Sequence, residues 1–224
     1  MRAAPFHPWD VDEDQAKEIQ RRLSKLVVLR DDFTIVGLVA GVSIRPVDLI
    51  TVRAAVCILD VPSMKTVDST TAAAKSHFRY MSGLRAFQAG PAVIAAFEKL
   101  HARPDFALWD GHGIAHPRRC GLASHLGVLL NIPSAGVSEE LLYGECKLDT
   151  LAEERGSRVP LLDPKDKIEI GAAVRTRSHI RPVFVSVGHR ISLESAIRIV
   201  YRCTPRNRIP EPLRAARIHV RSSN

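Results

Sequence analysis

Two long apolar runs in the N-terminal third of the chain set the first limit on its fold. Residues 34–44 and 51–59 are dominated by β-branched and small apolar side chains, which is typical of strands covered on both faces. A turn-forming sequence follows at residues 61–63, and residues 67–74 have the composition of a third strand. The sequence therefore predicts that a meander of three antiparallel strands begins the sheet.

Helix and strand patterns alternate after this meander. Helices are predicted where apolar side chains recur every three or four residues, with Asp10 or Asp12 capping the first, Pro91 in the first turn of the second, and Ser192 capping the last. The predicted helices cover residues 10–29, 91–101, 122–130 and 192–203. The later strands are predicted at residues 106–109, 134–137, 168–176 and 182–187, and a loop at residues 158–167. This order predicts an α/β fold with a mixed central sheet and helices on both faces.

The length of 224 residues favours one compact domain. We expect it to span residues 1–224, with flexible tails at residues 1–9 and 219–224. No apolar run reaches the length of a membrane span, and the four cysteines are too far apart in the chain for a Cys-x-x-Cys pair. We therefore expect a cytoplasmic monomer with reduced thiols and no membrane contact, in which Cys57 and Cys203 belong to the core.

The balance of charge favours an anionic partner. The chain has 32 Lys and Arg residues against 24 Asp and Glu residues, a formal net charge of +8. Nucleic acid is the first such partner to consider, although a solvated basic face without a ligand explains the same charge. The arginines that could follow a phosphate backbone are Arg118, Arg119, Arg175, Arg177, Arg181 and Arg190.

The most informative stretch is residues 109–119, Trp-Asp-Gly-His-Gly-Ile-Ala-His-Pro-Arg-Arg. Asp110 stands at the end of a predicted strand, and Gly111 and Gly113 would let the backbone approach a flat ligand closely. A glycine-rich turn with solvated charges is the plainer interpretation of the same residues.

The whole stretch resembles the Asp-Gly-x-Gly-x-Ala-His-Pro-Arg signature of the endonuclease V family. The resemblance extends to residues 39–42, 87–91, 120–127, 182–192 and 208–212, and covers residues 10–218. It implies a ribonuclease-H-like fold and Mg²⁺-dependent cleavage of a DNA or RNA strand near a deaminated base, chiefly inosine. That chemistry requires several carboxylates around a hard cation.

Most acidic positions implied by this resemblance hold other residues. Ser43 stands where the family has an aspartate, and Ala89 stands where it has a glutamate. Glu139 replaces a lysine, and Arg217 aligns near the fourth site residue of the family. Asp110 is the one retained catalytic carboxylate and expected metal ligand, unless Glu139 approaches the site from a new direction. We predict that Asp110 and Arg217 form a structural ion pair or a phosphate contact, and that Mg²⁺ is not bound.

The residues that read the base in the family are better preserved. Tyr80 matches the tyrosine of a Pro-Tyr-Ile-Pro wedge that fills the gap left by a flipped base, but both prolines are missing. The alternative is that Tyr80 is an ordinary surface aromatic and that the glycines only serve turns. His189 lies in a late motif and is expected to be a satisfied hydrogen-bonding group. The resemblance implies base-binding roles for Tyr80, Gly83, Gly111, Gly113, His116 and Leu142.

Three functions are compatible with these observations. The main prediction is a nucleic-acid-binding protein on the endonuclease V fold that is catalytically inactive because its metal ligands are replaced. The first alternative is an active Mg²⁺-dependent endonuclease V that acts on DNA or RNA near inosine in nucleic-acid repair. The second alternative is a protein-interaction scaffold, which no residue pattern favours directly.

Overall fold

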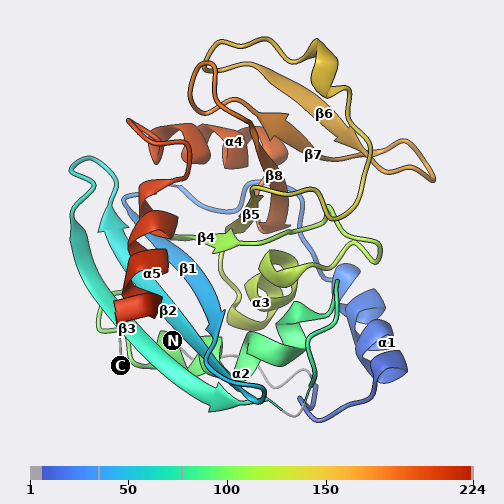
Figure 1. Ribbon diagram of the computed structural model, residues 1–224, viewed down its shortest axis with the longest axis vertical. Helices are drawn as coiled ribbons and strands as arrows, with labels where there is room; N and C mark the ends of the chain where they lie inside the picture. The colour runs from blue at the N-terminus through green and yellow to red at the C-terminus, as the bar shows by residue number, and fades with distance from the viewer. Residues whose placement is uncertain (1–6, 35, 77, 223–224) are drawn as a thin grey trace.

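The computed structural model of the protein describes residues 7–34, 36–76 and 78–222. Within these residues, eight strands form a mixed sheet in the order β3-β2-β1-β4-β5-β8-β7-β6 (Figure 1). The strands are β1 (Leu38–Pro46), β2 (Thr51–Asp60), β3 (Thr66–Lys75), β4 (Phe106–Asp110), β5 (Ser134–Ser138), β6 (Arg158–Leu162), β7 (Glu169–Val174) and β8 (Val183–His189). The predicted α/β class with a mixed central sheet is confirmed.

The first three strands form the predicted antiparallel meander. β1 pairs with β2 from Leu38 opposite Asp60 to Pro46 opposite Val52, and β2 pairs with β3 along its length. β1 begins later than predicted, at Leu38, although the carbonyl oxygen of Gly37 already accepts from the backbone N–H of Val61; residue 35 lies outside the described residues.

Parallel pairing begins where the chain returns to the other side of β1. β4 lies parallel to β1, and β5 lies parallel to β4, whereas β8 is antiparallel to β5. The carboxyl ends of β1, β4 and β5 therefore meet at one edge of the sheet, which is where ligands bind in open α/β sheets.

Helices cover both faces of the sheet, as predicted (Figure 1). On one face, α4 and α5 bury Val200 and Leu213 against Leu108 of β4. On the other face, α2 and α3 pack around Trp109 of the same strand, because neighbouring residues of a strand point to opposite faces. The helices are α1 (Glu13–Ser24), α2 (Arg85–Glu98), α3 (Leu122–Leu130), α4 (Leu193–Arg202) and α5 (Glu211–Ser222), with a short 3-10 turn, η1 (Leu148–Thr150).

Two predicted helices have different bounds in the structure. α1 starts after Asp12, whose side chain accepts from the backbone N–H of Gln15 in a capping box, and it ends at Ser24. α2 begins six residues before Pro91, so the proline lies inside the helix and not in its first turn. Burial of Phe87 and Ala89 offsets the weak helix propensity of the segment around Pro91.

Two other segments depart from the prediction. Helix α5 was not predicted, and β6 occupies part of the predicted loop at residues 158–167. The tail predicted at residues 219–224 is helical as far as Ser222. At the other end of the chain, Trp9 packs against two core clusters, while residues 1–6 lie outside the described residues.

Cys57 and Cys203 are buried, as predicted, and Cys120 is buried as well. None of the helices in the described part of the chain has the length and apolar composition needed to cross a membrane.

Candidate nucleotide-binding site

Two cavities meet at the carboxyl ends of the parallel strands. The first has a volume of about 380 Å³ and lies over the glycine-rich turn after β4. The second, of about 580 Å³, lies between β1 and α5. Asp110, the last residue of β4, lines both cavities. A ligand in one cavity is therefore next to a ligand in the other.

Both carboxylate oxygens of Asp110 accept hydrogen bonds from neighbouring side chains. Arg217 of α5 donates from Nη2 to Oδ1 at 2.7 Å and from Nε to Oδ2 at 2.9 Å. The hydroxyl of Ser43 donates to Oδ2 at 3.2 Å. The predicted pairing of Asp110 with Arg217 is confirmed, and it has the bidentate geometry that makes such pairs strong.

Glu139 extends this ion pair into a network. Its Oε1 accepts from Nη1 of Arg217 at 2.6 Å, and its Oε2 accepts from Nη1 of Arg208 at 2.7 Å. Burial alone would lower the pKa of Arg217, but the hydrogen bonds and charges of Asp110 and Glu139 outweigh it and raise the pKa above its usual value. Arg217 is therefore a permanent cation between two carboxylates.

The remaining substituted position does not face either cavity. Ala89 is fully buried in α2 and belongs to the core cluster between that helix and the sheet. The structure thus brings Ser43, Asp110, Glu139 and Arg217 together and leaves Ala89 apart.

A divalent ion needs several oxygen ligands that are not already held by cations. Both oxygens of Asp110 accept from Arg217, and the oxygens of Glu139 are divided between Arg217 and Arg208. Among the described residues there is no group of three or more His, Cys, Asp or Glu side chains that could hold a metal ion. This set of donors does not fit the Mg²⁺ on which the family depends.

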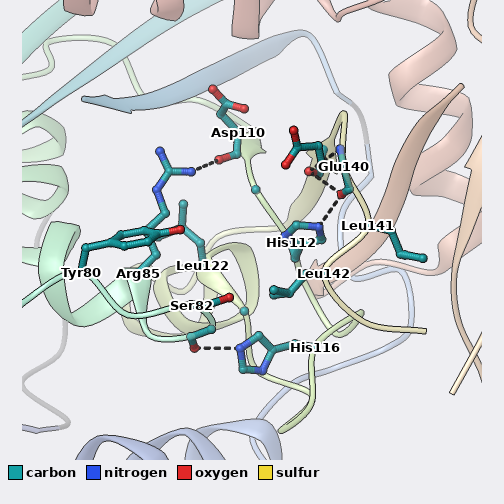
Figure 2. A pocket seen from close by; sticks show the side chains of 14 residues that line it. Tyr80, Ser82, Arg85, Asp110, His112, His116, Leu122, Glu140, Leu141 and Leu142 are labelled. Atoms are coloured by element: carbon teal, nitrogen blue, oxygen red, sulfur yellow. Dashed lines mark hydrogen bonds between the residues drawn. The ribbon is translucent and has the colours of Figure 1, made fainter. Parts of the chain in front are cut away.

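The first cavity has mixed polar and apolar walls. In Figure 2, Tyr80 and Arg85 lie on one side, and His112, Leu141 and Leu142 lie on the other. Its full lining comprises Tyr80, Ser82, Gly83, Arg85, Asp110, Gly111, His112, His116, Gly121, Leu122, Ser138, Glu140, Leu141 and Leu142. Apolar walls with a few fixed polar groups suit a flat heterocycle.

His116 fixes the floor of this cavity. It is 1% exposed, and its Nε2 is 2.8 Å from the carbonyl oxygen of Gly83, while its Nδ1 accepts from the backbone N–H of Arg118 at 3.2 Å. Burial lowers the pKa of His116 to about 4, so the ring is neutral and donates from Nε2 (Figure 2). Gly83 has a φ of +78°, a conformation that glycine adopts without strain.

The two glycines of the signature have different roles. Gly111 lines the cavity, and a side chain added there would meet only Leu122 at ordinary contact distance. Gly113 does not line it. Its backbone N–H donates to Ser186 at 2.8 Å, and an added side chain would collide with the carbonyl of Val187 on β8. Gly113 was predicted to bind the base, but it packs against β8 and not against the cavity.

Sequence reasoning missed Arg85 and His112 as site residues. Arg85 donates to the carbonyl oxygens of Asp110 at 3.2 Å and Ile44 at 3.1 Å, tying α2 to two parallel strands (Figure 2). His112 lies 2.9 Å from the carbonyl oxygen of Glu140, and burial lowers its pKa. His112 stood within the recognised signature, whereas nothing near Arg85 in the sequence indicated its role.

Most arginines proposed to follow a phosphate backbone have structural partners. Arg119 pairs with Asp163 and Asp166, and Arg190 pairs with Asp32. Arg118 donates to Gln20 and to Gly83, and Arg175 donates to the backbone of residues 151, 152 and 180. His189 accepts from the backbone N–H of Val28, which confirms it as a satisfied group.

The sheet, its helices and the cavity at the carboxyl ends of its parallel strands define a protein of the ribonuclease-H-like class. A family model for endonuclease V matches residues 21–218, and the chain belongs to the endonuclease V family.

Relatives cover nearly the whole chain. The endonuclease V of Trichormus variabilis is 46% identical over 212 residues, which is 94% of each chain. The crystal structure of the Streptomyces avermitilis endonuclease V matches with a TM-score of 0.89 and 39% identity, over 95% of this chain and 93% of that one. The Ciona intestinalis endonuclease V, crystallised with a 24mer DNA containing an inosine followed by a ribo-adenosine, matches with a TM-score of 0.79 and 30% identity, over 94% and 97% of the two chains.

These comparisons correct the main functional prediction. Ser43 and Ala89 stand where the resemblance implied acidic residues, and this led to the prediction of a catalytically inactive binding protein. That prediction is wrong, because relatives as similar as 46% over 94% of both chains are endonucleases V. The alternative, an endonuclease that acts near inosine, has the better support.

Proposed function

We propose that this protein is an endonuclease that cleaves a nucleic-acid strand near a deaminated base, with inosine as its preferred target. The observation that carries the proposal is the cavity over the Asp110-Gly111 turn, in a chain that matches endonuclease V over nearly its whole length. The Ciona relative was crystallised with inosine-containing DNA, which makes this base the first candidate for the cavity.

Recognition of the base is assigned to the walls of the first cavity. A flipped base would enter between Tyr80 at the rim and the neutral His116 at the floor. Leu122 and Leu142 supply apolar contact to its faces, and the backbone at Gly111 allows close approach. Because His116 is held by Gly83 and Arg118 before any ligand binds, little side-chain freedom is lost on binding.

Placement of the strand is assigned to the second cavity. It is lined by Arg45, Arg217 and Arg221, and it shares Asp110 with the first. A nucleotide whose base fills the first cavity therefore places its phosphate beside these arginines. Binding and orientation of the nucleotide are the parts of the reaction for which these residues account.

Labelled single-stranded DNA and RNA, each with and without one inosine, test the proposal. Each strand is incubated with the protein in Mg²⁺ or Mn²⁺, and binding and cleavage are scored in the same samples. We expect a cut at a fixed distance from the inosine, and none in the matched strand that carries adenosine. Equal cleavage of both strands, or cleavage of neither, would refute the proposal.

A further inference from the structure

Arg217 is the cation that neutralises Asp110 in this structure. The guanidinium lies between the carboxylates of Asp110 and Glu139, with donor–acceptor distances of 2.6–2.9 Å. Its side chain is 27% exposed, and the exposed part faces the second cavity. A guanidinium held in this way is a fixed positive charge that needs no metal ion.

Arg217 keeps part of its donor capacity. A guanidinium has five N–H groups, and the bonds to Asp110 and Glu139 use three of them. One N–H on each terminal nitrogen is not used by these bonds. Two carboxylates already order the Arg217 side chain. Binding of a phosphate oxygen to these N–H groups therefore costs little further side-chain entropy.

The charge around the second cavity favours a phosphate. Arg45, Arg217 and Arg221 line it together with two acids, Asp110 and Glu139. Both acids are neutralised by guanidinium groups, Glu139 by Arg208 as well as by Arg217. The exposed Arg45 and Arg221 then leave the cavity with an excess of positive charge.

A divalent ion that took both oxygens of Asp110 would displace Arg217. That exchange would break two charge-assisted hydrogen bonds and leave the arginine beside a second cation. Phosphate binding requires neither step, because it uses the donors that remain.

We propose that Arg217, anchored by Asp110 and Glu139, binds a phosphate of the nucleic-acid strand in place of a divalent ion, so that strand binding does not depend on Mg²⁺. This inference rests on the proposed function, since the strand is the inosine-containing substrate. It concerns how the phosphate is held and is tested separately from cleavage.

The first test compares binding with and without divalent ions. The probe is a fluorescein-labelled single-stranded DNA with one inosine, and fluorescence anisotropy is measured in excess EDTA and in Mg²⁺. We expect dissociation constants that agree within about twofold, since the fixed guanidinium supplies the cation in both buffers. An affinity more than about tenfold higher in Mg²⁺ would overturn the inference.

The second test removes the guanidinium. Arg217→Ala should weaken strand binding and reduce the slope of log affinity against log salt by about 0.7, the value for one phosphate contact on a single strand. Arg158→Ala is the matched control, because it removes an arginine that pairs with Glu194 on α4, away from both cavities. An unchanged slope in Arg217→Ala would contradict the inference.

A third comparison separates loss of the contact from exposure of Asp110. In the double variant Asp110→Asn/Arg217→Ala, the uncompensated carboxylate is gone. We expect binding to stay weak, because the phosphate donor is still missing; recovery to the wild-type affinity would show that Arg217 acts only by masking Asp110. Arg217→Lys keeps the charge and should retain most of the salt slope. Circular dichroism and thermal unfolding check that each variant is folded.

The two proposals fail in different ways. Equal affinity for strands with inosine and with adenosine, together with no cleavage, would refute the proposed function. Inosine-specific cleavage combined with Mg²⁺-dependent binding would leave the proposed function in place and refute the role of Arg217. Electron paramagnetic resonance of Mn²⁺ adds a readout without substrate: we expect no Mn²⁺ site that Asp110→Asn abolishes.

Discussion

Single side chains in the first cavity differ sharply in how firmly they are held. Tyr80 is 69% exposed at the rim, whereas His116 is 1% exposed and bonded through both ring nitrogens. Replacing His116 would disturb the cavity floor as well as recognition. Tyr80 is therefore the side chain whose removal tests recognition without disturbing the fold.

Tyr80→Ala should weaken binding of the inosine strand by roughly tenfold, because stacking of one base on an aromatic ring contributes about 1–3 kcal/mol. Tyr80→Phe should retain the affinity, since the ring face is kept. Anisotropy with the labelled strand measures both variants, and urea unfolding should show that their stability is unchanged.

Ile168→Ala is the matched control for Tyr80→Ala. Ile168 is 55% exposed and does not line the cavity. If both alanine variants lose the same affinity, Tyr80 has no specific role in the site.

At the scale of secondary-structure elements, the site depends on how closely α5 approaches β1. A side chain added at Gly41 in the middle of β1 would collide with the backbone of Pro212 at the start of α5. This close contact holds α5 over the carboxyl ends of the parallel strands and brings Arg217 to Asp110.

Gly41→Ala should lower the free energy of unfolding by roughly 1–3 kcal/mol, the usual cost of overpacking a well-packed interior. It should also weaken strand binding, because displacement of α5 moves Arg217. Urea unfolding and anisotropy measure the two effects.

Gly37→Ala controls for the loss of a glycine close to the same strand. An added side chain there would meet Asp105 at 3.6 Å, an ordinary contact distance, so we expect a change below about 1 kcal/mol. If Gly41→Ala is as mild as Gly37→Ala, the position of α5 does not depend on this contact.

At the scale of the whole molecule, three buried histidines make stability sensitive to acid. Burial is the main cause in each: it lowers the pKa of His116 and of His189 to about 4, and that of His125 well below its usual value. His116 and His189 belong to different parts of the fold and bond to different segments, Gly83 and Val28. Protonation of any of them therefore opposes the native state.

Stability should fall as the pH is lowered from about 6.5 to about 4. In this window the unfolded chain binds protons at these histidines and the native protein does not, so the free energy of unfolding rises with pH. A fully shifted histidine contributes at most roughly 3 kcal/mol above this window. Urea unfolding at several pH values between 4.5 and 7.5 measures the trend.

His116→Gln should flatten this pH dependence, because glutamine keeps a donor for Gly83 and does not titrate. His101→Gln is the control, since His101 is exposed and its backbone N–H donates to Asp68. A slope that is the same in His116→Gln and in the wild type would show that His116 does not contribute.

Local sequence patterns correctly predicted the elements in which buried residues recur at a regular spacing. The predicted helix at residues 122–130 coincides with α3, and Ser192 caps α4 by accepting from the backbone N–H of Ser195. Helix α5 was missed although Leu213, Ala216 and Val220 recur at helical spacing; residues 208–212 were interpreted only as part of the family resemblance. α2 passes through Pro91 because tertiary packing on Phe87 and Ala89 outweighs the local cost.

The sequence by itself determined the family signature around Asp110 and the mixed sheet. These are properties of short segments, and they can be recognised from residue types and spacing. It also suggested that Arg217 could meet Asp110 and that Glu139 could approach the site, but not that Arg208 would join them. Only the tertiary structure decided that network, because its members come from β4, α5 and two connecting segments up to 107 positions apart, and ion pairs form by distance in space. The same distances placed a guanidinium on both carboxylate oxygens of Asp110.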